Sequence, residues 1–275
     1  MQTNLANNSA RTRLLEGKNA IIYAAAGAVG RTIAHAFARE GARVFLTGRN
    51  AASVEALARE ISAEGGMAEA ARVDALDEAQ VDAHFALAVK SAGAIEISFN
   101  AIGIPQEGIQ GIPLTAIALA SYCLPIETYA KSHFITSRAA ARHMELRGRG
   151  AILLHTPEPA RAGVPLVGGM GPAWASLEGL VRFFSAELAS KGVRVVCLRT
   201  TGMLETATID TVFGLHAKGH GISYEQFRSG VEARTHRQRS TTLRELADAA
   251  VFAASDRAGA LTGGVLNLTG GAVAD

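Results

Sequence analysis

Cysteine, long apolar runs and surplus charge of either sign are all scarce in this chain of 275 residues. Its two cysteines, Cys123 and Cys197, lie in apolar sequence, so we expect buried, reduced thiols in a cytoplasmic protein, not a disulfide scaffold. No run reaches the roughly 18 apolar residues that a membrane span requires, and the N-terminal stretch lacks the apolar core of a secretory signal. The 27 basic and 25 acidic side chains form no basic cluster, which argues against a nucleic-acid partner.

Short apolar runs alternate with amphipathic helical patterns along most of the chain. The expected strands are 19–24, 43–47, 67–73, 94–100, 151–155, 193–198 and 265–268. The expected helices are 28–40, 51–64, 74–91, 126–147 and 171–190. Strands that are apolar throughout and separated by helices are typical of a parallel sheet covered on both faces. The sequence therefore predicts an α/β fold, a Rossmann-like, doubly wound, seven-stranded parallel sheet in three layers.

The chain divides into a short polar arm and one domain. Residues 1–16 are expected to form a flexible N-terminal arm, because they are polar and precede the first strand. Residues 17–275 form a single Rossmann-like domain. The segment from about 200 to 240 follows the sixth strand, carries Gly219, Gly221 and Gly230, and is expected to form a helical lid over the ligand site.

The loop after the first strand is built from small residues, in the sequence Tyr23-Ala-Ala-Ala-Gly-Ala-Val-Gly30. Such a turn lets the backbone of a helix N-terminus approach a pyrophosphate, although tight strand–helix packing alone also favours Gly and Ala. The second strand ends at Gly48-Arg49, which faces the adenosine ribose in dinucleotide folds. An Arg there suits a 2′-phosphate, so Arg49 favours NADP(H) over NAD(H); the alternative is a solvated loop Arg.

Further candidate cofactor residues end the third and fourth strands. Asp74, followed by Ala75, could accept a hydrogen bond from an adenine amino group, or it could cap the next helix, a role for which Asp77 competes. Asn100 could meet the cofactor ribose or only bridge neighbouring strands. The full set of predicted cofactor residues is Ala24, Gly27, Val29, Gly30, Arg49, Asp74, Ala75, Asn100, Ala101 and Gly103.

Taken in order, these landmarks resemble the short-chain dehydrogenase/reductase family over about residues 17–275. The resemblance is carried by the Gly27/Gly30 turn, LTGRN at 46–50, VDA at 73–75, NAIG at 100–103, LEGL at 177–180, AEL at 186–188, VRV at 193–195 and LTGGVLNLTGG at 261–271. It implies a seven-stranded Rossmann-like sheet, NAD(P) binding, a small-molecule substrate, and a homodimer or homotetramer built on the helices at 126–147 and 171–190. With the GxxGxxG spacing of extended members, Ala24 replaces the first Gly.

The residues that carry the family's chemistry differ in this chain. The family uses a Tyr as general acid/base and a Lys four residues later, yet no Tyr here is followed by Lys at that spacing. The resemblance places Met170 at the Tyr position and Trp174 at the Lys position. It places Thr156 near the family's substrate-orienting Ser, and Tyr129 at the position of its helix Asn. Neither Met nor Trp can exchange a proton with an alkoxide.

We identify three candidate catalytic residues, Tyr129, His155 and Thr156. An unassisted Tyr has a pKa near ~10 and is a poor base at neutral pH, whereas His titrates closer to pH 7. His155 could equally be packed at the strand end. The lid histidines His216, His220 and His236 are expected at the surface, and the eight His show no metal-ligand spacing.

The substrate pocket is expected to be apolar, with Met170, Trp174, Met203 and Leu204 in its wall. Met170 and Trp174 could instead fill space that no substrate occupies. The sequence favours an NADP-dependent oxidoreductase acting on a small apolar carbonyl, hydroxyl or enone compound with a non-standard active site. The alternative is a catalytically inactive nucleotide-binding sensor or interaction module, whose main support is the missing Tyr–Lys pair.

Overall fold

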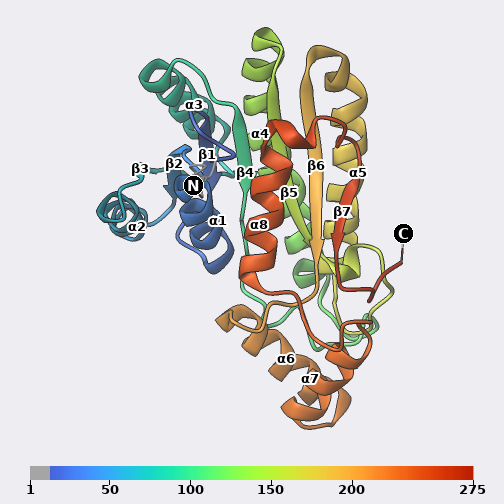
Figure 1. Cartoon of the computed structure of the whole chain (residues 1–275). Helices are drawn as coiled ribbons and strands as arrows, with labels where there is room; N and C mark the ends of the chain where they lie inside the picture. The colour runs from blue at the N-terminus through green and yellow to red at the C-terminus, as the bar shows by residue number, and fades with distance from the viewer. Residues whose placement is uncertain (1–12, 275) are drawn as a thin grey trace, which may run out of the picture.

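A single parallel sheet forms the centre of the protein in a computed structural model that describes residues 13–274 (Figure 1). Its strands, in chain order, are β1 (Asn19–Tyr23), β2 (Arg43–Gly48), β3 (Met67–Arg72), β4 (Ile97–Asn100), β5 (Gly150–Pro157), β6 (Val193–Thr200) and β7 (Val265–Leu268). Their order across the sheet is β3-β2-β1-β4-β5-β6-β7, and every neighbouring pair is parallel. The Rossmann-like, seven-stranded sheet predicted from the sequence is confirmed.

Helices cover both faces of the sheet and give the three layers. Side chains of α1 (Ala28–Arg39), α2 (Ala51–Ala63) and α8 (Leu243–Ala254) share one apolar cluster with one face of the strands. Side chains of α3 (Glu78–Ala92), α4 (Leu119–Arg147) and α5 (Met170–Leu188) form the cluster on the other face. Strand residues alternate between the two clusters, as Ile21 and Ile22 of β1 do, because successive side chains of a strand point to opposite faces.

Two further helices lie beyond the carboxyl ends of the strands. These are α6 (Ala207–His220) and α7 (Tyr224–Ala233), which follow β6 and sit below the sheet in Figure 1. Thr206 and Ser223 cap them, each by accepting a hydrogen bond from a backbone N–H in the first turn. Both helices lie in the segment 200–240 for which the sequence predicts a helical lid.

Three local expectations differ from the structure. The long helix α4 begins at Leu119 and not at 126, because it continues through Pro125, which is itself buried. Helix α8 was not among the expected helices. Residues 1–12 of the expected arm lie outside the described residues, but Leu15 is fully buried and its backbone N–H bonds Glu40, so 13–16 belong to the domain.

The structure also bears on the expectations for the cysteines and for membrane spans. Both cysteines are free thiols; Cys197 is buried as expected, while Cys123 is half-buried. Among residues 13–274, no helix is both long and apolar enough to cross a membrane.

Candidate functional site

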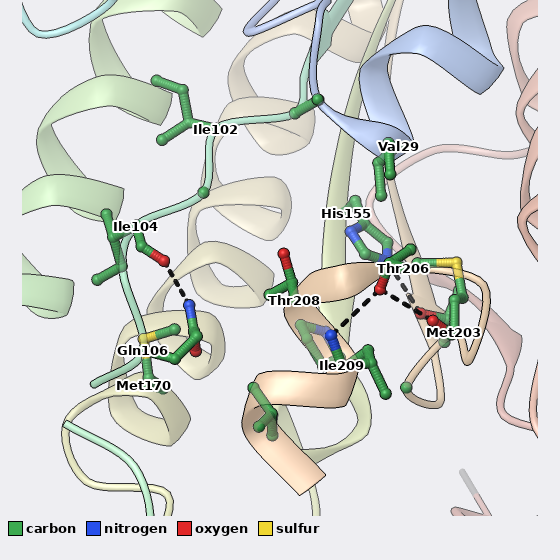
Figure 2. Close-up of a pocket in the computed structure, with 18 of the residues that line it drawn as sticks. Val29, Ile102, Ile104, Gln106, His155, Met170, Met203, Thr206, Thr208 and Ile209 are labelled. Carbon is green, nitrogen blue, oxygen red and sulfur yellow. Dashed lines mark hydrogen bonds between the residues drawn. The ribbon is translucent and has the colours of Figure 1, made fainter. Parts of the chain in front are cut away.

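A cavity of about 640 Å³ opens at the carboxyl ends of the strands. This is where doubly wound sheets bind ligands, and the volume is within the usual range for small-molecule and cofactor sites. Its wall is continuous from the β1–α1 turn and the end of β2, past the ends of β4, β5 and β6, to α5, α6 and α7. We call it the central cavity; Figure 2 shows part of its lining.

The β1–α1 turn brings bare backbone to one end of the central cavity. Ala24 has φ +54°, a left-handed conformation that costs a residue with a Cβ more than it costs Gly. A Cβ on Gly30 would come within 2.6 Å of the Ala24 carbonyl oxygen, so the close packing of α1 on the turn requires Gly there. Gly27 is the N-cap of α1 and offers no side chain to the first N–H groups, which leaves that helix end open to an anion.

Arg49 lies at the end of β2, exposed, and lines the central cavity together with Asn50 and Ser53. Among the described residues, no carboxylate pairs with its guanidinium, in contrast to Arg31 and Arg43, which pair with Glu60 and Glu69. A positive charge beside a cavity wall, with hydroxyl and amide neighbours, fits a phosphate group.

Seven of the ten predicted cofactor residues line the cavity, and three do not. Asn100, Ala101 and Gly103 line the cavity, and the Asn100 amide also holds its own strand end by donating to Thr136 and accepting from the Ile102 N–H. Ala24, Gly27, Val29 and Arg49 also line the cavity. The three that do not are Gly30, Asp74 and Ala75. Asp74 accepts from the Leu76 N–H in a local turn, and Asp77 caps α3.

Tyr129 of α4 lines the cavity together with Met170 and Trp174 of α5. The Tyr129 and Trp174 rings pack edge to face with centroids 6.3 Å apart, and Met170 is 1% exposed. Burial raises the pKa of Tyr129 to about 12, although a hydrogen bond with the Trp174 side chain acts in the opposite direction. The phenol is therefore neutral and a potential proton donor at physiological pH.

His155 and Thr156 lie on opposite faces of β5, because they are consecutive in a strand. His155 lines the cavity, and its Nε2 lies 2.9 Å from the Thr200 hydroxyl. Burial lowers the pKa of His155 to about 4, so the ring is neutral near pH 7. Thr156 faces away and donates to Glu178 of the buried Glu178–Arg199 pair. The structure thus places Tyr129 and His155 on one cavity and separates Thr156 from them.

The lid side of the cavity contains polar groups that the sequence reasoning missed. Glu158, His216 and Arg234 all line it, and His216 is 2% exposed, so its expected position at the surface is wrong. No local signal marks these residues, because they come from three separate segments. Of the two lid-proximal apolar residues predicted for the substrate pocket, Met203 lines the cavity and Leu204 does not.

The fold and the cavity together define the structural class of the protein. A doubly wound sheet with an open helix N-terminus after β1, and a cavity over the strand ends, is the architecture of dinucleotide-binding α/β proteins. A family model described as enoyl-(acyl carrier protein) reductase matches residues 24–273, and the chain belongs to the short-chain dehydrogenase/reductase family. The resemblance read from the sequence is therefore confirmed.

Individual proteins are similar over nearly the full length. An uncharacterized oxidoreductase, YxbG, of Bacillus subtilis (strain 168) is 32% identical and aligns over 94% of this chain and 92% of its own. The structure of a 7α-hydroxysteroid dehydrogenase complexed with NADH and 7-oxo glycochenodeoxycholic acid is 28% identical, with TM-score 0.83 over 96% of this chain and 97% of that one. A gluconate 5-dehydrogenase from Burkholderia cenocepacia J2315, in complex with NADP and tartrate, is 25% identical, with TM-score 0.80 over 95% and 97%.

Proposed function

We propose that this protein is an NADP(H)-dependent oxidoreductase that acts on a small carbonyl, hydroxyl or enone compound through a non-standard active site. One observation carries the proposal. The same continuous cavity joins the β1–α1 turn and Arg49 to the side chains of Tyr129 and His155. A nucleotide held at the first two would leave room beside the last two for a substrate.

The chain's own groups suit each part of the cofactor. The open N-terminus of α1 at Gly27 would hold the pyrophosphate, and Arg49 would hold a 2′-phosphate. Asn100, Ala101 and Gly103 would lie along the nucleotide toward the middle of the cavity. When bound, the reduced cofactor supplies a hydride to the substrate carbon.

Tyr129 is the proposed proton donor to the substrate oxygen. An alkoxide is a stronger base than the Tyr129 phenolate, even though burial raises the pKa of this phenol to about 12, so the transfer runs downhill. Solvent then returns the proton to Tyr129. The Trp174 ring packs edge to face against the phenol and, being uncharged, lowers the phenol pKa less than a Lys ammonium would.

His155 and the apolar wall would orient the substrate. His155 is neutral near pH 7, so one ring nitrogen donates and the other accepts. Met170, Met203 and Trp174 add apolar surface to the wall of the cavity, which favours a substrate with an apolar part. Thr156 has no role in the proposed reaction, because its hydroxyl donates a hydrogen bond to the buried Glu178 carboxylate.

The cofactor proposal is tested at Arg49. Fluorescence titration is expected to give tighter binding of NADPH than of NADH. Arg49→Ala should weaken NADPH binding roughly tenfold to hundredfold, the usual value of a charge-assisted phosphate contact, and leave NADH binding nearly unchanged. The control is Arg59→Ala on α2, an exposed Arg away from the cavity. Equal binding of both nucleotides, unaffected by the Arg49 change, would contradict the preference.

A second candidate is a catalytically inactive nucleotide-binding sensor or interaction module. It is favoured by Met170 and Trp174, which are 1% and 7% exposed and stand in the cavity wall in place of a Tyr–Lys pair. The two functions separate in a turnover assay with purified, NADPH-binding protein. An oxidoreductase reduces at least one ketone or enone, whereas a sensor binds nucleotide without turnover and Met170→Ala leaves nucleotide affinity unchanged.

A further inference from the structure

Two hydrogen-bond acceptors in the lid side of the central cavity are buried without a partner among the described residues. One is Oε2 of Glu158, in the turn after β5, and the other is Nδ1 of His216, on α6. The residues are 7% and 2% exposed, and both belong to the cavity wall. A buried acceptor without a donor is costly, so its presence beside a ligand cavity needs an explanation.

The state of the His216 ring follows from a chain of hydrogen bonds that starts at a backbone carbonyl. The Ile104 oxygen can only accept, so the Gln106 amide nitrogen donates to it at 2.5 Å (Figure 2). The Gln106 oxygen then accepts from the Gln110 amide nitrogen, also at 2.5 Å. The Gln110 oxygen is left to face His216 Nε2 at 2.9 Å, so Nε2 carries the proton.

Nδ1 of His216 is accordingly a bare lone pair. A second proton on the ring is disfavoured, because burial, His220 and Arg234 lower the pKa of His216 to about 4. A ligand group that meets this nitrogen near neutral pH must therefore donate a hydrogen bond to it.

Glu158 also needs a hydrogen-bond donor. Its Oε1 accepts from Arg234, after α7, at 2.7 Å, and this bond ties the lid to the end of β5. Oε2 has no donor in the part of the chain that the structure describes. Apolar residues such as Pro157, Val164, Val167 and Val231 also line the cavity. Burial raises the pKa of Glu158 while Arg234 opposes that change.

We propose that Glu158 Oε2 and His216 Nδ1 form a subsite for hydroxyl groups, so that the substrate carries at least one hydroxyl besides the group that reacts. This inference rests on the proposed function for the reaction but concerns only how the substrate is held. Hydroxyls satisfy both acceptors, whereas a carboxylate would face two acceptors and would have to displace Glu158 from Arg234. Since both atoms are covered here, contact requires a shift of α6 and α7, the two lid helices.

A matched set of ligands tests the subsite by binding as well as by turnover. Cyclohexanol has one hydroxyl, and the 1,2-, 1,3- and 1,4-cyclohexanediols add a second at increasing distance on the same apolar ring. Isothermal titration of the NADP⁺-saturated protein, and of the protein alone, measures their affinities; NADP⁺-dependent oxidation gives kcat/KM. At least one diol is expected to bind the wild-type protein at least about tenfold more tightly than cyclohexanol.

Two conservative substitutions locate the effect. Glu158→Gln keeps an acceptor for Arg234 and turns the unpartnered oxygen into a donor, and His216→Gln keeps a donor for Gln110 while it removes the Nδ1 acceptor. Either change should reduce the diol preference, the ratio of diol affinity to cyclohexanol affinity, at least about threefold. His216→Asn, which retains an acceptor near the Nδ1 position, should retain more of the preference than His216→Gln. Thermal denaturation checks the folding of each variant.

The outcomes separate the subsite from the reaction. Equal binding of diols and cyclohexanol by the wild type, or a diol preference that survives both Gln variants, would overturn the subsite. A diol preference that depends on Glu158 and His216, without any oxidation of the bound ligand, would support the subsite and count against the oxidoreductase proposal.

Discussion

The role proposed for Tyr129 depends on its position more than on its residue type. As a free side chain it is a weak acid, yet in the structure it lies beside Trp174 in the wall of a cavity that also reaches the β1–α1 turn. Desolvation raises its pKa to about 12, so near pH 7 the phenol is fully protonated and there is no phenolate to act as a base. A proton can therefore pass only from Tyr129 to a stronger base, such as the alkoxide of the proposed reaction.

Replacement of Tyr129 is the residue-scale test of this role. Tyr129→Phe is expected to lower kcat for carbonyl reduction by roughly 10²-fold or more, the usual contribution of a positioned acid, and to leave NADPH affinity within about twofold. Tyr122→Phe on the same helix is the control, since Tyr122 does not line the cavity. Steady-state kinetics of the two variants would exclude Tyr129 as the donor if both retained full kcat.

At the scale of elements, the β1–α1 turn combines a required glycine with a strained alanine. Gly30 has no room for a Cβ, whereas Ala24 holds a left-handed conformation despite its Cβ. The strain is tolerated because Ala25, the next residue, is fully buried and its N–H bonds Thr47 of β2, which fixes the path of the chain.

Relief of that strain should be measurable. Ala24→Gly is expected to raise the free energy of unfolding by about 0.5–1 kcal/mol, the left-handed penalty less the extra chain entropy of Gly. Ala26→Gly is the control within the same turn; Ala26 has no positive φ, so the change should be neutral or destabilising. Urea denaturation of both variants gives the comparison, and destabilisation by Ala24→Gly would show that the Ala methyl contributes packing that outweighs the strain.

At the scale of the whole molecule, buried histidines link the fold to pH. Burial is the largest cause that lowers the pKa of His133, His155 and His216 from 6.5 to about 4. The folded state therefore binds fewer protons than the unfolded state between these values, and stability that is present above pH 6.5 is lost as the pH falls toward 4. Glu158 acts in the opposite direction, because its pKa is raised.

The expected loss is about 2 kcal/mol by pH 5 for each of His133 and His216, which are 1% and 2% exposed. His133→Asn keeps a donor near Nδ1 for the Tyr129 carbonyl and should flatten the decline between pH 7 and pH 5. The exposed His236, replaced by Gln, is the control. Urea midpoints across this range provide the measurement. A wild-type midpoint that does not fall between pH 7 and pH 5 would contradict the expected loss of stability.

The apolar outer surface of α4 and α5 suggests how two chains associate. Phe183 is 74% exposed and Phe134 is 43% exposed, and the Phe134 and Phe184 rings pack 6.2 Å apart between the two helices. Large exposed aromatic side chains favour a protein–protein contact. We propose a homodimer or homotetramer built on this surface.

Light scattering at micromolar concentration is expected to give a dimer or tetramer. Phe183→Glu should shift the protein toward monomer, because a charge would be desolvated in the contact. Leu87→Glu on α3, at a position that is 64% exposed, serves as the control. A wild-type monomer, or an assembly indifferent to Phe183→Glu, would reject this surface as the interface.

The sequence by itself determined the order of the seven strands and of the helices between β1 and β6, the small-residue turn at Gly27 and the absence of a Tyr–Lys pair at the family's spacing, because periodicity and spacing are properties of the chain alone. It missed the start of α4, since Pro125 normally ends a helix and only tertiary packing overrides that preference. Residue type also could not predict that Thr156 lies on the face of β5 that points away from the cavity. The tertiary structure alone joined His216 to Gln110, 106 positions away, and Glu158 to Arg234, 76 positions away. Partner and burial decide the protonation state of such groups, and both arise only when distant segments pack together.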